Sequence, residues 1–262
     1  MAKVYLVGAG PGAADLLTLR AARIIESADV ILYDALVGDD VLSLANPTAR
    51  LIDVGKRAER KFFDKSFHQK EINALLVRSA QAAGVVVRLK GGDPLVFGRA
   101  AEEMEALRDA GIDFEIVPGV TAACSAAAAA KISLTDRRVA SQVLLTTAHH
   151  SEEYQNRDLR DGSASGATTV IYMPGRDYSL VQEQLREQGV GDQIPCLVVS
   201  RVSFPDQQVF ATTVGTLDEA PLLPAPSLLI VGEVARQQSA RLDVAYQEVT
   251  NSQTRFALAW YL

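Results

Sequence analysis

Residues 3–15, KVYLVGAGPGAAD, decide the class of fold. The stretch begins with a short apolar run that ends at Gly8, which is typical of a β-strand followed by a turn. Apolar residues then recur at helical spacing from Leu16 to Ala28, and Asp15 stands at the expected N-cap position. A strand, a glycine-rich turn and an amphipathic helix in this order predict an α/β unit.

The same unit recurs through the first half of the chain. The strands are continuous apolar runs, which is the pattern of parallel strands that helices cover on both faces. We therefore expect a parallel α/β sheet. Its further strands are expected over residues 30–33, 51–54, 85–89 and 114–117, and its further helices over 69–83 and 100–110.

After about residue 120 the chain contains more strands than helices, which indicates a second domain with a mixed sheet. Strands are expected over 143–147, 170–173, 196–199, 209–213 and 228–231, with one clear helix over 180–188. We expect an N-terminal α/β domain with the glycine-rich loop and the catalytic residues at 1–120, a C-terminal mixed-sheet α/β domain at 121–236 and a tail at 237–262.

Composition excludes several classes of protein. The 262 residues carry a formal net charge of −6, whereas a binder of duplex nucleic acid normally has a basic face, so we expect no nucleic-acid partner. The sequence contains no run of about 18 apolar residues and no signal-peptide pattern. We therefore expect no membrane partner and a cytoplasmic location.

Cysteine and histidine are rare. Cys124 and Cys196 are too few for a disulfide framework, and their apolar surroundings predict two small core residues. The three histidines do not form a metal-ligand spacing with cysteines or carboxylates, so we expect no metal site.

Ligands of parallel α/β sheets bind at the carboxyl ends of the strands. The first of these ends, GAGPGA at 8–13, matches the dinucleotide pattern G-x-G-x-x-G/A, and Asp34 lies where a ribose-binding acid would sit. This pair favours an NAD(P)-dependent oxidoreductase. However, Pro11 has no N–H to offer a pyrophosphate, and the helix starts late. A tight strand-to-helix turn is the alternative interpretation.

Two further loops carry candidate chemistry. Gly91-Gly92-Asp93-Pro94 lets a ligand lie against the main chain with a carboxylate beside it, although an Asp-Pro turn that opens a helix has the same sequence. Lys56 begins a basic loop, and Arg88, Lys90 and Arg99 are expected at the same edge. Such local positive charge indicates a polyanionic ligand, with a mixed solvated loop as the alternative.

Together these motifs resemble those of the uroporphyrinogen-III C-methyltransferases, a family of tetrapyrrole methylases. The resemblance covers residues 3–235, and the order and spacing of the first six motifs are its most specific part. These six are VGAGPG at 7–12, YD at 33–34, VGKR at 54–57, RLKGGDP at 88–94, FGR at 97–99 and VPGVTA at 117–122.

The resemblance implies two α/β domains of the tetrapyrrole methylase type, with the active site in the cleft between them, and a homodimer. It also implies S-adenosylmethionine as cofactor, with S-adenosylhomocysteine as its product. The residues implied to line the cofactor site are Pro11, Gly91, Gly92, Asp93, Val96, Thr121, Ala122, Met173 and Val202.

The implied reaction is methylation of uroporphyrinogen III at C2 and C7, which gives precorrin-2 for the synthesis of sirohaem, cobalamin or haem d1. Matching positions suggest Asp34 as proton acceptor, Lys56 as proton donor and Arg99 as a third catalytic residue. Residues implied to hold the tetrapyrrole are Arg99, Glu102 and Arg137. A carboxylate suits the removal of a proton after methyl transfer.

Some positions depart from the family pattern. Asp136 replaces the usual histidine, Ala100 and Ala101 replace glycines, and residues 200–203, SRVS, stand where a glycine is usual. Asp136 would repel an anionic substrate or pair with a nearby arginine. A methyltransferase for a different tetrapyrrole and a non-catalytic tetrapyrrole-binding relative therefore stay open as alternatives.

Overall fold

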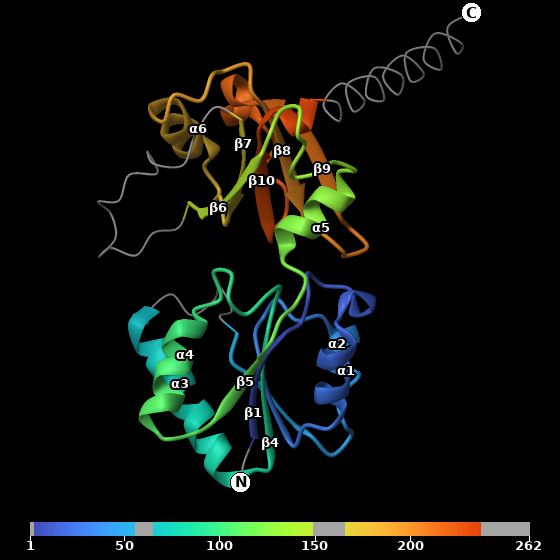
Figure 1. The fold of residues 1–262 in the computed structure, drawn as a ribbon, viewed down its shortest axis with the longest axis vertical. Coiled ribbons are helices and arrows are strands. Elements are labelled where there is room, and N and C mark those ends of the chain that lie inside the picture. Colours follow the sequence, from blue (N-terminus) through green and yellow to red (C-terminus); the bar gives the residue numbers. More distant parts are fainter. Residues whose placement is uncertain (1–2, 56–64, 149–165, 237–262) are drawn as a thin grey trace, which may run out of the picture. The chain divides into compact units, whose positions relative to one another are not determined.

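The computed structural model describes residues 3–55, 65–148 and 166–236 (Figure 1). The chain divides into two compact units, Met1–Ser125 and Ala126–Leu262. Each unit is built on one five-stranded sheet. This confirms the predicted α/β class with a second, mixed sheet. Lys56 lies outside the described residues.

Unit 1 is a parallel sheet with the strand order β3-β2-β4-β1-β5. Its elements, in chain order, are β1 Lys3–Gly8, η1 Ala14–Leu16, α1 Leu19–Glu26, β2 Val30–Tyr33, α2 Asp39–Leu42, β3 Arg50–Asp53, α3 Lys65–Ala82, β4 Val85–Lys90, α4 Ala100–Asp109 and β5 Phe114–Val117. α5, Ala122–Ala129, follows and crosses into the second unit.

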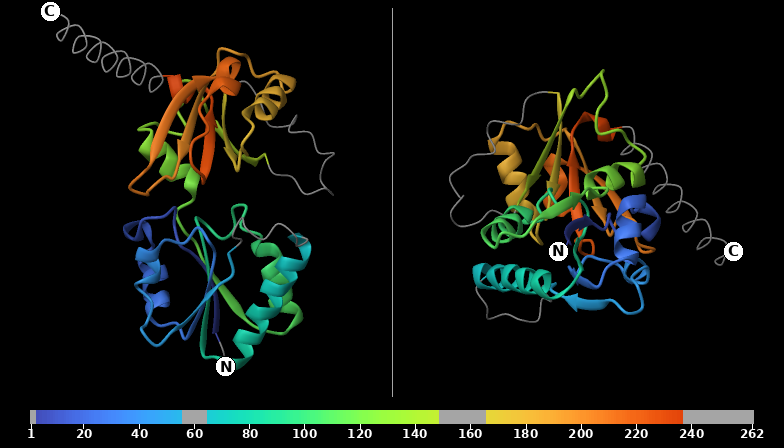
Figure 2. Two further views of the ribbon diagram at one scale, coloured as in Figure 1. Left: turned by 180° about the vertical axis from the view of Figure 1, so that it is seen from behind. Right: turned by 60° about the horizontal axis from the view of Figure 1, so that its bottom comes forward.

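Helices cover both faces of this sheet, with α1 and α2 on one side and α3 and α4 on the other (Figures 1 and 2). Alternate residues of β1 point to opposite faces of the sheet and belong to two hydrophobic cores, one on each face. Val7 packs with the α1 and α2 side chains, whereas Val4 and Leu6 pack with those of α3 and α4. Burial on both faces explains why the strands are continuous apolar runs.

Unit 2 is a mixed sheet with the strand order β6-β7-β10-β8-β9, in which only β6 and β7 run parallel. α6 and η4 supply side chains such as Val181, Leu185 and Leu217 to the core on one face. The elements are β6 Gln142–Thr147, β7 Ala167–Tyr172, α6 Tyr178–Glu187, β8 Pro195–Ser200, β9 Gln208–Thr213, η4 Val214–Glu219, β10 Ser227–Val231 and η5 Glu233–Ala235.

Two local predictions are wrong. α1 begins at Leu19 and is capped by Thr18, whose hydroxyl accepts the Ala21 N–H at 3.1 Å. Asp15 lies in the preceding 3₁₀ turn instead, because this turn takes the residues between the glycine loop and α1. Cys196 is buried, which raises the pKa of its thiol to about 12, but Cys124 is exposed.

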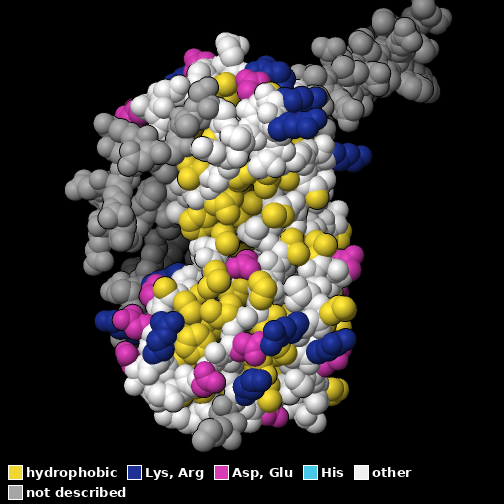
Figure 3. All heavy atoms as spheres, in the orientation of Figure 1, with side chains coloured by type: hydrophobic (Ala, Val, Ile, Leu, Met, Phe, Trp, Pro, Cys, Tyr) yellow, Lys and Arg dark blue, Asp and Glu magenta, His cyan; other side chains and the backbone are white. Residues whose placement is uncertain are grey.

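The free edge of the first sheet is charged. Glu115 on β5 pairs with Lys3 at 3.9 Å and with Arg20 of α1. Figure 3 shows acidic and basic side chains close together on this unit. Charges on an edge strand discourage pairing with the edge of another sheet. Separately, none of the helices in the described ranges is long and apolar enough to cross a membrane.

The capping of α1 gives a test of the local structure. Thr18→Ala removes the acceptor for the Ala21 N–H and should lower the free energy of unfolding by about 1 kcal/mol. Asp15→Ala is the matched control, and it should change that free energy by less than about 0.5 kcal/mol. Thermal unfolding followed by circular dichroism measures both. If Asp15→Ala lowered the free energy of unfolding more than Thr18→Ala does, Asp15 and not Thr18 would be the N-cap of α1.

Candidate functional site

The loops that follow β1 and β4 are joined backbone to backbone. The Gly10 N–H donates to the Gly92 carbonyl at 3.2 Å, and the Gly92 N–H donates to the Gly10 carbonyl at 2.6 Å. The Ala9 N–H donates to the Lys90 carbonyl at 2.7 Å. These bonds occupy backbone N–H groups that a pyrophosphate would need as donors, and Pro11 has no N–H group to offer. The geometry therefore counts against the dinucleotide interpretation of the GAGPGA loop.

Glycines allow three strand ends to converge. A Cβ on Gly8 would lie 2.6 Å from the Gly119 nitrogen and 2.7 Å from the Gly92 oxygen, closer than real Cβ atoms come. Gly92 itself has a φ of +71°, which favours glycine. The ends of β1, β4 and β5 thus meet at glycines, whose main chain no side chain covers. A ligand that lies against the backbone requires such uncovered main chain.

Asp93 ties two of these ends together. Its Oδ2 accepts the Gly119 N–H at 3.0 Å, and its Oδ1 accepts the Leu95 N–H at 2.8 Å. Each carboxylate oxygen has two lone pairs, so Asp93 can still accept hydrogen bonds from a ligand. The Asp-Pro turn and the ligand site, which were alternatives in the sequence, are compatible at this loop.

Asp34 lies at the end of β2, where its N–H donates to the Leu89 carbonyl at 3.2 Å. Its Oδ1 accepts a hydrogen bond from Nη2 of Arg88. The side chain is 29% exposed. One side of the carboxylate is therefore held by a cation, while the carboxylate remains within reach of a ligand at the carboxyl edge of the sheet.

Arg88 and Lys90 do not add free positive charge to this edge, and the expectation that they do is wrong. They lie two residues apart on β4 and point to the side of the sheet that α4 covers. There they bind the two oxygens of Glu103, with Arg88 Nε to Oε1 at 2.8 Å and Lys90 Nζ to Oε2 at 2.9 Å. All three side chains are buried.

The pKa values of the two cations shift in opposite directions. For Lys90, burial lowers the pKa and the charge of Arg88 lowers it further, against the attraction of Glu103. For Arg88, burial also lowers the pKa, but the attraction and hydrogen bonds of Asp34 and Glu103 together outweigh it and raise the pKa. Arg88 is therefore the cation that stays firmly charged beside Asp34.

Arg99 and Glu102, both predicted to hold the substrate, hold each other. Arg99 Nε and Nη2 donate to the two Glu102 oxygens at 2.7 and 2.8 Å. Both side chains are partly exposed, so the pair can open to another carboxylate. Arg99 and Phe97 have φ values of 55° and 52°, and such strained positions concentrate at ligand sites.

Large apolar side chains stand exposed on the same loops. Leu36, Leu95 and Phe97 are 52%, 58% and 40% exposed. A Cβ on Gly91 would lie 2.8 Å from the Leu36 Cβ, so Leu36 lies directly against the glycine loop. Sequence analysis missed Leu36 and Leu95, although apolar residues just after strand ends were a usable signal. The other predicted residues of this unit, Pro11, Val96, Thr121 and Ala122, are half-buried.

The predicted residues of unit 2 follow its strands. Met173 comes directly after β7 with a φ of 49° and is 48% exposed. After β8, Arg201 and Ser203 have φ values of 47° and 69°, whereas Val202 between them is buried. The left-handed backbone at Arg201 and Ser203 is a conformation that favours glycine, the residue that the resemblance implies for this stretch.

Asp136, at a position where the resemblance implies a histidine, pairs with a nearby arginine, as one of the two predicted outcomes had it. Its partner is Arg138, whose Nε lies 2.9 Å from Oδ1. This side-chain hydrogen bond, with a second from the Arg138 backbone N–H, lowers the pKa of Asp136 to about 2. Arg137 is exposed and available to bind an anion.

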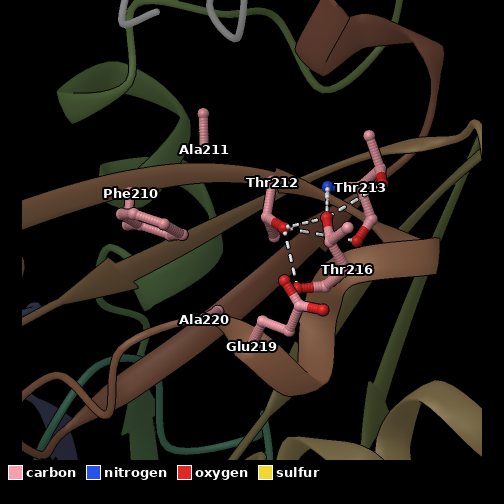
Figure 4. A pocket seen from close by; sticks show the side chains of 7 residues that line it. All are labelled: Phe210, Ala211, Thr212, Thr213, Thr216, Glu219 and Ala220. Atoms are coloured by element: carbon pink, nitrogen blue, oxygen red, sulfur yellow. Dashed lines mark hydrogen bonds between the residues drawn. The ribbon is translucent and has the colours of Figure 1, made fainter. Parts of the chain in front are cut away.

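The hollow in Figure 4 belongs to β9 and η4 and measures about 420 Å³. Its threonine hydroxyls bind one another, with Thr216 Oγ1 2.9 Å from Thr212 Oγ1 and 3.1 Å from Thr213 Oγ1. None of the predicted site residues lines it. Within residues 3–55, 65–148 and 166–236, no group of His, Cys, Asp and Glu could hold a metal ion.

The glycine convergence is testable. Gly8→Ala places a methyl group against the backbone of Gly119 and Gly92 and should destabilise the protein by about 1–3 kcal/mol. Gly191→Ala, which meets nothing within 4 Å, is the control and should stay within about 0.5 kcal/mol of the original protein. Urea unfolding compares the two. Equal stabilities would show that the strand ends can separate without loss.

Comparison with known proteins identifies the family. The chain is 46% identical over 236 residues to siroheme synthase 1 of Pectobacterium atrosepticum and 44% identical over 232 residues to siroheme synthase of Neisseria meningitidis serogroup B. Each match covers 88% of this chain but 48% and 47% of the relative, so the chain spans about half the length of these relatives.

Solved structures match over nearly their full length. The uroporphyrin III C-methyl transferase of Thermus thermophilus superposes with a TM-score of 0.77 at 37% identity, covering 89% of this chain and 99% of that enzyme. The same values hold for its complex with S-adenyl homocysteine. Residues 3–218 match the model of the Tetrapyrrole (Corrin/Porphyrin) Methylases, and the chain belongs to this family.

Proposed function

We propose that this chain is an S-adenosylmethionine-dependent uroporphyrinogen-III C-methyltransferase that methylates C2 and C7 and produces precorrin-2. The observation that carries the proposal is the match to 99% of the length of an enzyme of this activity, at 37% identity. The relatives named siroheme synthase support a place in sirohaem synthesis.

The cofactor is S-adenosylmethionine, which supplies a methyl group already activated by its sulfonium. The carboxyl edge of unit 1 suits it chemically. Asp93 offers acceptor oxygens for hydroxyl or ammonium groups, and the bare main chain at Gly92 permits close approach. The residues we assign to the cofactor are Pro11, Gly91, Gly92, Asp93, Val96, Thr121, Ala122, Met173 and Val202.

Side chains of unit 1 would then serve the substrate and the proton. Asp34 accepts the proton that the macrocycle loses from another position once the ring carbon is methylated, and Arg88 keeps its carboxylate in place. Arg99 releases Glu102 to bind a substrate carboxylate, and we assign the same task to Arg137 of unit 2. Leu36 and Phe97 offer apolar surface to the macrocycle. Lys56 remains the predicted proton donor.

The pairing of Asp136 removes one argument against uroporphyrinogen III as the substrate. Because Arg138 holds this carboxylate, the pair carries no net charge, and the expected repulsion of a polyanionic substrate is removed. A homodimer and a cytoplasmic location are further parts of the proposal. The first rests on the family resemblance, and the second rests on the sequence pattern.

The cofactor assignment predicts selective binding. Isothermal titration calorimetry should show binding of S-adenosylhomocysteine and no heat with NAD, because the N–H groups of Ala9 and Gly10 are already bonded and Pro11 has no N–H. Anaerobic incubation with S-adenosylmethionine and uroporphyrinogen III should yield a product heavier by two CH2 units in mass analysis, since each methyl group gained is accompanied by the loss of one proton. Binding of NAD without S-adenosylhomocysteine would overturn the assignment.

The role of Asp34 predicts a loss confined to turnover. Asp34→Asn keeps the shape and an acceptor for Arg88 but removes the base, so kcat should fall by about 10²–10⁴-fold. The Kd of S-adenosylhomocysteine should change less than about twofold, since only the chemical step is affected. Asp39→Asn, an exposed change at the start of α2, is the control and should retain the original kcat.

A further inference from the structure

Three charged side chains are sealed between the first sheet and α4. Arg88, Lys90 and Glu103 are 3%, 2% and 0% exposed. Buried charges are unfavourable unless paired and hydrogen-bonded, and apolar residues of similar volume often replace them without loss of stability. Stability alone therefore gives little reason to place two cations and a carboxylate here.

Every nitrogen of the Arg88 guanidinium is held. Nε donates to Glu103, and Nη1 donates to the carbonyls of Leu32 at 3.3 Å and Leu89 at 3.0 Å. Nη2 donates to Asp34 at the carboxyl edge. The guanidinium is planar, so the hydrogen bonds that hold Nε and Nη1 also fix the direction in which Nη2 points.

We propose that Glu103 is a positioning residue for Asp34: it anchors Arg88 by Nε so that Nη2 holds the Asp34 carboxylate where the proton is released. This inference rests on the proposed function, in which Asp34 is the proton acceptor. Glu103 has no exposed surface and lies in α4, so it acts through Arg88 and does not meet the substrate.

Lys90 completes the anchor by binding the second oxygen of Glu103 at 2.9 Å, which limits rotation of that carboxylate. The charged groups that face Asp34 from β4 are Arg88 and Lys90, and Glu103 faces both of them from α4. A Cβ on Gly98 would lie 3.1 Å from Cε of Lys90, so the loop before α4 packs against the lysine stem. The loop that leads to α4 and the anchor are thus parts of one packed structure.

Two double variants separate positioning from folding. Lys90→Met with Glu103→Gln keeps an acceptor for Arg88 Nε, whereas Lys90→Met with Glu103→Leu removes it. Both remove one positive and one negative charge, and each leaves one buried donor without its acceptor. A purely structural role for Glu103 therefore predicts similar losses in the two variants.

We expect the leucine variant to have a kcat on the order of 10–100-fold below that of the glutamine variant, since a small misplacement of a reacting group has effects of this size. The two variants should differ by less than about threefold in their KM for uroporphyrinogen III. They should also differ by less than about threefold in their Kd for S-adenosylhomocysteine. Glu105→Gln, an exposed change on the same helix, should keep the original kcat.

The difference must also depend on Asp34. In an Asp34→Asn background the two double variants should have the same kcat within about threefold, because the group that Glu103 positions is gone. Equal kcat values with Asp34 present, or a difference that persists without it, would overturn the inference. If the leucine variant does not fold, Arg88→Lys replaces it. A lysine cannot reach Glu103 and Asp34 together, so retained kcat in that variant would overturn the inference as well.

The controls distinguish this inference from the function on which it rests. If the original protein does not methylate uroporphyrinogen III, or if Asp34→Asn keeps full kcat, the proposed function fails and the inference falls with it. If the original protein is active and Asp34→Asn is impaired, equal double variants contradict the positioning role alone.

Discussion

The ends of β1, β4 and β5 approach one another so closely that a single methyl group has no room between them. Gly8, Gly92 and Gly119 make this approach possible, and the hydrogen bonds between Gly10 and Gly92 and between Asp93 and Gly119 hold it. Everything at the carboxyl edge depends on this contact. It exposes main chain to a ligand, uses the donors that a dinucleotide would need and sets the start of the loop that leads to α4.

The second requirement of the edge is a carboxylate held in a defined place. β2 ends at the edge and presents Asp34, while β4 brings Arg88 to it from the neighbouring strand. The Asp34 carboxylate is thus supported by a network of Arg88, Lys90 and Glu103 between β4 and α4.

The sequence was sufficient to predict the parallel sheet, because most of its strands are short apolar runs, and a glycine or an aspartate follows soon after each strand. It also predicted the glycine loops and Asp34 as the features of the edge. It could not predict that Arg88 and Lys90 turn inward, because strand residues two apart share a face but the identity of that face depends on where α4 packs. The cap of α1 was misplaced for a similar reason. Asp15 and Thr18 are both good caps, and the 3₁₀ turn that decides between them has no clear signature in the residues.

The order of strands in the first sheet constrains how a nascent chain can fold. β1 pairs only with β4 and β5, so it leaves the ribosome well before either of its neighbours exists. β2 and β3 are adjacent in the sheet and can pair earlier. During that interval the apolar residues of β1 have no sheet to join, and unpaired strands of this kind are prone to aggregate. The strand that carries the first glycine of the site is therefore the one that waits longest for its partners during synthesis.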